Sequence, residues 1–192
     1  LRRRGAWLWV GSLWRDCVLG ARADRFTLLE ARSVRLGGPE RCDHPARPGG
    51  FEPPRYAVLA VLADRLLGDT VALVGFHLAP GVQTPGGAYR DDRPLLVARH
   101  RREVARLQRL ADEQRAEGRR VLVAGDSNFD GLRLDGLESA WSAQRRFPGV
   151  APTFGTGSAG RRIDDVFGTG EVTGLDTLET GSDHRALLVR RT

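Results

Sequence analysis

Apolar residues occur along this chain in short runs of strand length. Residues 56–64 and 70–78 are two such runs, and the Leu67-Gly68-Asp69 segment between them has the composition of a turn, so together they predict a β-hairpin. Residues 25–34 mix apolar and β-branched side chains and predict an earlier strand. Shorter runs predict three more strands, at 121–124, 163–167 and 185–189.

The pattern changes period over residues 95–117, where leucine, valine and alanine recur every three or four positions between arginine and glutamate. That spacing predicts an amphipathic helix, which Gly118 ends. A short helix is expected around Trp141, and the segments rich in glycine and proline predict loops at 37–54, 81–94 and 148–162. This order indicates one α/β domain over residues 1–192, with a mixed sheet and helices packed outside it.

The composition is that of an ordinary globular domain. The chain has 192 residues, 41% of them hydrophobic and 28% charged, which excludes a disordered or coiled-coil protein. The apolar runs are too short for a membrane span, and Cys17 and Cys42 can be free or paired. Because the chain begins at Leu1 and has no methionine, we expect that its N-terminal portion is missing. The compartment stays open, with the cytoplasm slightly favoured.

Arginine supplies all 30 basic residues, and the net charge is +6. Guanidinium groups suit phosphate, so a polyanionic partner such as nucleic acid is one interpretation. The charges are scattered along the chain, which favours solvated side chains, and the exclusive use of arginine is typical of a codon preference rather than a function. Arg161 and Arg162 can either grip a polyanion or be solvated, and the sequence leaves both open.

Two polar motifs adjoin predicted strands. Asp126 and Asn128, in the segment GDSN, come directly after the strand at 121–124, and side chains two residues apart on an extended chain point the same way. They can bind a hard cation, or hold a water and a phosphate oxygen, although a plain turn uses the same residue types. Asp183 and His184 precede the last strand and can act as metal ligand and general base.

Four further residues have a structural interpretation, and His77, Asp164 and Asp165 have a functional one as well. His77 ends an apolar strand, where a histidine is more often hydrogen-bonded in the core than catalytic. Asp164 and Asp165 are typical of a solvated turn, but one of them can orient a histidine. His100 lies among arginines on the predicted helix and is expected to be solvated.

Two motif matches do not indicate a site. Residues 155–160 spell GTGSAG, but a proline precedes this glycine pattern and a strand follows it, whereas a dinucleotide site needs a strand before and a helix after. Cys42-Asp43-His44 has no further ligands at zinc-finger spacing, so a structural zinc site is not expected.

Four motifs keep a specific order along the chain: VGFHL around His77, GDSN at 125–128, RRIDD at 161–165 and SDH at 182–184. Together they resemble the endonuclease/exonuclease/phosphatase family, the deoxyribonuclease I-like phosphodiesterases. The resemblance implies an α/β (α+β) fold of two packed mixed β-sheets flanked by helices, a four-layer αββα sandwich. It also implies a phosphoesterase that uses Mg²⁺ or Mn²⁺ at the strand ends.

The resemblance assigns substrate contacts to the first two motifs. His77 matches the histidine that contacts the scissile phosphate, and Asp126 and Asn128 match the pair that positions the nucleophilic water and the phosphate. Asp126 is also expected to bind the metal. Hydrogen bonds from His77 and Asn128 to the phosphate would stabilise the charge that develops there.

The last two motifs contain the residues expected to transfer a proton and to provide a second metal ligand. By the resemblance, Asp164 helps to fix the catalytic histidine, Asp183 is a metal ligand and His184 is the general base. A divalent cation can polarise a phosphoryl oxygen, while the base takes the proton of the attacking water.

This chain departs from the family pattern at several positions. The family's metal-binding glutamate and an early asparagine cannot be placed, and Glu30, the nearest glutamate among apolar residues, lies too late in the chain. Ser127 stands where the family often has phenylalanine, and Asp165 where an aromatic residue often follows. Arg185-Ala186 replaces a segment that usually contains proline.

The sequence therefore predicts a monomeric, metal-dependent phosphoesterase whose substrates are phosphodiesters or phosphomonoesters, nucleic acid among them. The alternative is a catalytically degenerate member of the same fold that serves as a nucleic-acid or polyanion binding module. A third hypothesis is an unrelated arginine-rich nucleic-acid binder, which would bind in a strongly salt-dependent way without a metal.

Overall fold

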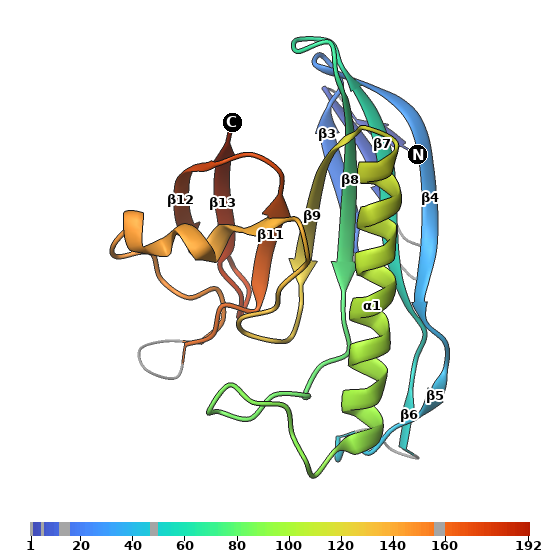
Figure 1. Cartoon of the computed structure of the whole chain (residues 1–192), viewed down its shortest axis with the longest axis vertical. Coiled ribbons are helices and arrows are strands. Elements are labelled where there is room, and N and C mark those ends of the chain that lie inside the picture. Colours follow the sequence, from blue (N-terminus) through green and yellow to red (C-terminus); the bar gives the residue numbers. More distant parts are fainter. Residues whose placement is uncertain (1, 5, 12–15, 47–49, 156–159) are drawn as a thin grey trace.

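The computed structural model describes residues 2–4, 6–11, 16–46, 50–155 and 160–192. Its centre is a six-stranded mixed sheet with the order β10-β11-β9-β8-β7-β4, and the helix α1 (Pro94–Ala116) lies along one face of it (Figure 1). The strands of this sheet are β4 (Phe26–Gly37), β7 (Arg55–Asp64), β8 (Thr70–His77), β9 (Arg120–Asp126), β10 (Glu138–Ser139) and β11 (Asp164–Gly168).

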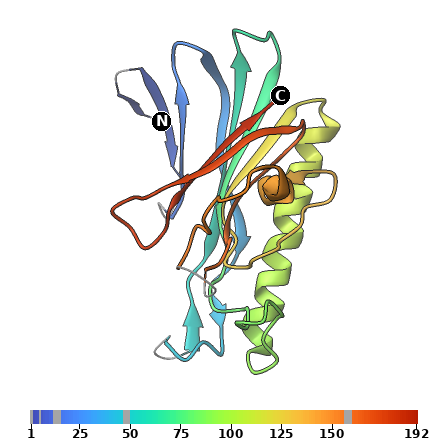
Figure 2. The ribbon, with the colours of Figure 1, turned by 90° about the vertical axis from the view of Figure 1, so that its left-hand side faces the viewer.

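Two smaller sheets lie on the face of the large sheet opposite α1 (Figure 2). One contains β1 (Arg2–Arg4), β2 (Trp7–Gly11) and β3 (Val18–Arg22), and the other pairs β12 (Val172–Leu178) with β13 (Ala186–Arg191). The packed sheets confirm the predicted fold class, although the large sheet is mixed and the two smaller ones are antiparallel. A separate pair joins β5 (Glu40–Arg41) to β6 (Phe51–Glu52), and residues Ala140–Arg146 form a short 3-10 helix, η2.

The central strands are buried on both faces. Leu107 and Leu110 of α1 pack against Val74 of β8 and Val121 of β9 in one hydrophobic cluster. On the other face, residues of β2 and β3 pack against β7 in a second cluster that contains Val10, Ala21, Val58, Ala60 and Leu62. Burial on both sides explains why the runs at 56–64 and 70–78 are almost continuously apolar.

The start and end of α1 follow from local chemistry. The carboxylate of Asp43 accepts hydrogen bonds from the backbone N–H groups of Leu95 and Leu96, at 2.9 and 3.0 Å, and so satisfies donors that a helix leaves free at its N-terminus. Gly118, with φ of 73°, takes the left-handed conformation that ends the helix. Asp43 of the Cys42-Asp43-His44 segment therefore caps the helix.

Most of the predicted elements are confirmed. The helix at 95–117 is α1, the hairpin is the antiparallel pair β7 and β8, and the helix around Trp141 is η2. The loop expected at 37–54 contains the short strands β5 and β6, while residues 156–159 of the GTGSAG segment lie outside the described residues. Cys17 and Cys42 form no disulfide bond with each other, and no helix in the described ranges is long and apolar enough to cross a bilayer.

The expectation of a solvated His100 is wrong, because its side chain is 0% exposed. Its Nε2 lies 2.8 Å from the carbonyl oxygen of Ser127, and its Nδ1 lies 3.1 Å from the hydroxyl of Tyr89. Since a carbonyl can only accept, Nε2 carries the proton and Nδ1 accepts from the tyrosine. The ring thus ties α1 to the GDSN segment, and burial lowers the pKa of His100 to about 4.

Acid should therefore destabilise the fold through His100. The unfolded ring titrates near 6.5 and the buried ring near 4, so its contribution is complete above pH 6.5 and is lost as the pH falls towards 4. The difference corresponds to about 3 kcal/mol. Urea unfolding at pH 7 and pH 4 measures it: the free energy of unfolding should fall less in His100→Gln than in the wild type. Equal decreases in the two proteins would contradict this role.

Candidate active site

The site lies where the parallel strands β8 and β9 end. His77 and Asp126 are register partners at the carboxyl ends of these strands. Side chains alternate between the two faces of a strand, and Val74 and Val121 point to the face that packs against α1. By this alternation, the side chains of His77 and Asp126 lie on the opposite face. The Nε2 of His77 lies 3.7 Å from Oδ2 of Asp126. The carboxyl ends of neighbouring parallel strands are the usual place for a ligand in an α/β sheet.

The antiparallel neighbour β11 adds a second carboxylate. Asp164 is the register partner of Asp126, so the two acidic side chains stand side by side. Oδ2 of Asp164 lies 2.7 Å from Nδ1 of His184, in the loop before β13. Because a carboxylate only accepts, Nδ1 carries the proton and the neutral ring keeps its free lone pair on Nε2.

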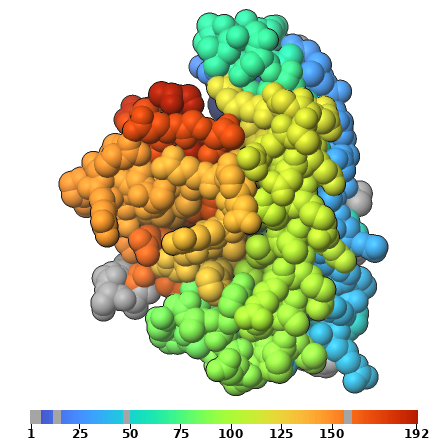
Figure 3. Space-filling model, in the orientation of Figure 1, coloured from blue at the N-terminus to red at the C-terminus, as the bar shows by residue number. Residues whose placement is uncertain are grey.

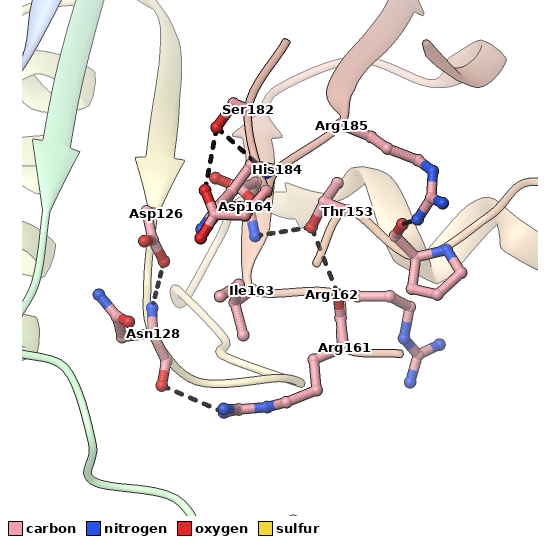
Figure 4. A network of polar contacts seen from close by, with 12 residues as sticks. Asp126, Asn128, Thr153, Arg161, Arg162, Ile163, Asp164, Ser182, His184 and Arg185 are labelled. Carbon is pink, nitrogen blue, oxygen red and sulfur yellow. Dashed lines mark hydrogen bonds and ion pairs between the residues drawn. The ribbon is translucent and has the colours of Figure 1, made fainter. Parts of the chain in front are cut away.

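These side chains form a group that can hold a metal ion. One ligand atom from each of Asp126, Asp164 and His184 lies within 4.8 Å of the others (Figure 4), and within the described ranges of the chain this is the single such group of three. Carboxylate oxygens suit Mg²⁺ and Mn²⁺. The structure therefore brings together three of the residues that the sequence singled out, from three separate segments.

Burial and charge shift the pKa values at this edge in different directions. Burial raises the pKa of Asp126 to about 6, and the nearby carboxylate of Asp164 adds to the rise. Burial lowers the pKa of His77, and the positive charge of Arg55 lowers it further. For His184, burial lowers the pKa, but the hydrogen bond and the charge of Asp164 outweigh it, so the net shift is upward.

The GDSN segment is held in one conformation. A Cβ on Gly125 would lie 1.9 Å from the carbonyl oxygen of Phe76, so a larger residue does not fit. The backbone N–H of Asn128 donates to Oδ1 of Asp126 at 2.7 Å, and Nδ2 of Asn128 donates to the carbonyl of Leu78 at 3.0 Å. The side chain of Asn128 is thereby fixed beside the carboxylate.

Ser127 explains one departure from the family pattern. Its side chain is fully buried, and its hydroxyl lies 2.7 Å from the carbonyl oxygen of Ile163 and 2.8 Å from that of Phe129. The backbone N–H of Ser127 also donates to Ile163. A small polar residue at this position ties the GDSN segment to the segment that carries Asp164.

Two candidates lie apart from the group of three. Asp183 is exposed and accepts a hydrogen bond from the hydroxyl of Ser182 at 3.0 Å. Glu30 of β4 pairs with Arg32 at 2.8 Å. Its register partner Val61 pairs with Ala72, five residues before His77 on β8, or about 17 Å along the strand.

The roles of Thr153 and Phe154 were not predicted from the sequence. The buried Thr153 accepts a hydrogen bond from the N–H of Asp164 at 3.2 Å, and its carbonyl accepts from the N–H of Arg185 at 2.7 Å. The ring of Phe154 lies 5.0 Å from that of His184. The PTF segment at 152–154, which precedes RRIDD, is the signal that points to this support.

Comparison with known proteins agrees with this geometry. Residues 17–184 match the model of the Endonuclease/Exonuclease/phosphatase family. No curated protein sequence matches the chain.

Solved structures share the fold at low identity. The chain is similar to humanized D. rerio TDP2 (15% identity, 96% of this chain and 75% of that chain, TM-score 0.63). It is also similar to a mannosyl-6-phosphatase of Bacteroides thetaiotaomicron (15%, 97% and 76%, TM-score 0.61). The human Nocturnin catalytic domain with bound sulfate matches at 16% identity over 90% of this chain and 62% of that chain, with a TM-score of 0.62.

The upward pKa shift of His184 should depend on Asp164. In metal-free buffer, Asp164→Asn removes both the charge and the ionic hydrogen bond, so the pKa of His184 should fall. Asp183→Asn is the matched control, because it removes a carboxylate that contributes less to the same shift. NMR titration of the His184 ring protons measures this pKa in both variants. An equal decrease of the pKa in the two variants would contradict the assigned contact between Asp164 and His184.

Proposed function

The chain belongs to the endonuclease/exonuclease/phosphatase family, which indicates a hydrolase acting on phosphoester bonds, and from that premise we propose a divalent-metal-dependent phosphoesterase. The observation that supports it most strongly is the group formed by Asp126, Asp164 and His184 within 4.8 Å of one another. Anionic ligands and a histidine at one strand edge are what hydrolysis of a phosphate ester requires.

The donor set fits a hard divalent cation. The half-buried carboxylate of Asp126 has a pKa raised to about 6, so it gains stabilisation from a nearby positive charge. We propose Asp126 and Asp183 as the carboxylate ligands of Mg²⁺ or Mn²⁺, and Asp183 adjoins His184 in the same loop. When bound, such an ion would supply a Lewis acid for a phosphoryl oxygen.

The remaining residues would bind the phosphate and move a proton. His184 takes the proton of the attacking water on Nε2, and Asp164 holds the ring by its Nδ1 at 2.7 Å. His77 is neutral at pH 7 because burial lowers its pKa, and a neutral ring still has one N–H to donate. Asn128 gives one amide hydrogen to Leu78, and its second amide hydrogen is available to the phosphate.

A second candidate function is a catalytically degenerate binding module of the same fold. The supporting observation is that, over the residues the structure describes, the group able to hold a metal contains no glutamate. With a net charge of +6, such a module would bind polyanions in a strongly salt-dependent way and without a metal requirement. Turnover of a phosphoester argues against it.

Removal of the base should abolish most of the activity. In the full-length protein, His184→Ala should lower the rate of bis(p-nitrophenyl) phosphate hydrolysis about 10²- to 10⁴-fold. His44→Ala is the control, since His44 lies in the segment that caps α1 and outside the group of three. A rate for His184→Ala equal to that of the control would sink the assignment of the base.

Metal removal gives an independent test. EDTA should stop hydrolysis, and Mg²⁺ or Mn²⁺ should restore it. The affinity for Mn²⁺ should fall as the pH drops below about 6, because Asp126, with a pKa of about 6, must be ionised to bind the ion. Calorimetric titration between pH 5 and pH 8 measures the affinity, and full activity in EDTA would be the contrary result.

A further inference from the structure

A hollow of about 820 Å³ adjoins the site on the side of the loop that follows β8. In Figure 3 that loop (green) lies beside the segment near residue 130 (gold), and residues of both line the hollow. Three arginines reach it: Arg90, Arg161 and Arg162. None of them belongs to the group that can hold a metal.

The wall of the hollow is rigid because Gln83 connects its parts. This side chain is 6% exposed. Its Nε2 donates to the carbonyls of Gly87 and Asp130, at 2.8 and 2.9 Å, and its Oε1 accepts from the backbone N–H of Asp130 at 2.9 Å. The Oε1 also accepts from the guanidinium of Arg161. All the hydrogen-bonding capacity of the amide is used, so the two loops and the arginine are held together.

Arg161 carries a charge that no carboxylate neutralises. Its guanidinium donates to two neutral oxygens, Oε1 of Gln83 and, at 3.4 Å, the backbone carbonyl of Asn128 (Figure 4). Within the described ranges Arg161 makes no ion pair, and the residues outside those ranges include neither aspartate nor glutamate. By contrast, Arg162 pairs with Asp130 at 3.1 Å, and Arg90 pairs with Asp92 at 2.7 Å.

The backbone of Arg161 is fixed as firmly as its side chain. It forms a β-bridge with Phe154, whose ring lies against His184. A positive charge is therefore positioned between the residue proposed to bind the scissile phosphate, Asn128, and the open hollow. A guanidinium with free donors and no carboxylate partner is a ready site for phosphate.

We propose that this hollow binds a second phosphate group of the substrate and that Arg161 is the residue that recognises it. The inference rests on the proposed phosphoesterase function and narrows its substrate to esters that carry another phosphate next to the scissile one. A nucleic-acid strand and a small bisphosphorylated molecule both have this chemistry.

Matched substrate pairs separate the two sources. The first pair is thymidine 5′-(p-nitrophenyl phosphate) with and without a 3′-phosphate, and the second is glucose 1,6-bisphosphate against glucose 6-phosphate. For at least one pair, the second phosphate should lower KM about tenfold in the wild type. A lower KM for the doubly phosphorylated member of the thymidine pair alone would identify nucleic acid as the substrate class. A lower KM in the glucose pair alone would identify a small bisphosphate.

Arg161→Gln should abolish the preference for a second phosphate, so that kcat/KM falls about tenfold more for the doubly phosphorylated substrate than for the singly phosphorylated one. Arg90→Gln is the matched control, because it removes an equal charge from the same hollow but one that Asp92 already neutralises. Arg161→Lys should keep part of the preference. An equal loss for both members of a pair, or the absence of a preference in the wild type, would overturn the proposal.

A binding measurement tests the second-phosphate subsite even when no substrate is hydrolysed. In metal-free buffer, methylenebisphosphonate should bind the wild type and Arg90→Gln equally, and Arg161→Gln about tenfold more weakly. Calorimetry measures the affinities. Equal affinity in all three proteins would refute the subsite, whereas loss of turnover with these affinities intact would refute only the proposed chemistry.

Discussion

Backbone pairing across three strand ends sets the chemistry of this site. His77 pairs with Asp126, and Asp126 pairs with Asp164, so the hydrogen bonds of the sheet hold two carboxylates side by side. Ligand atoms of these carboxylates lie within 4.8 Å, where two negative charges repel by at least about 3 kcal/mol at an effective dielectric constant of about 20. A positive charge at this edge relieves that repulsion, and both a divalent cation and a protonated His184 provide it.

The elements around the sheet keep this edge in place. Ser127 joins the GDSN segment to the carbonyl of Ile163, and the buried His100 joins it to α1. From the same helix, Glu103 accepts a hydrogen bond from the backbone N–H of Ala79 at 2.8 Å, directly after β8. Polar residues buried on the helix therefore hold the loops after both parallel strands, and such contacts are expected to preorganise a site rather than to drive folding.

The sequence predicted the strands, the helix and the order of the motifs because burial on both faces leaves clear periodic patterns. It did not predict the short strands β1 to β3 or β12; in β2, β3 and β12, exposed residues interrupt the apolar runs. The environment of His100 was missed because charged neighbours hid its place on the buried face of α1, in phase with Leu96 and Leu107. The partners of Arg161 depend on a contact 78 residues away with Gln83, which no local pattern contains.

The central claim is that Asp126, at the end of β9, binds one divalent cation, with His184 beside it as the base and Asp164 as the residue that orients this base. Anomalous diffraction from crystals of the protein grown with Mn²⁺ tests this most directly. The account predicts one manganese peak within bonding distance of a carboxylate oxygen of Asp126. A crystal that hydrolyses a phosphoester, yet shows its manganese elsewhere or none at this edge, would contradict the claim.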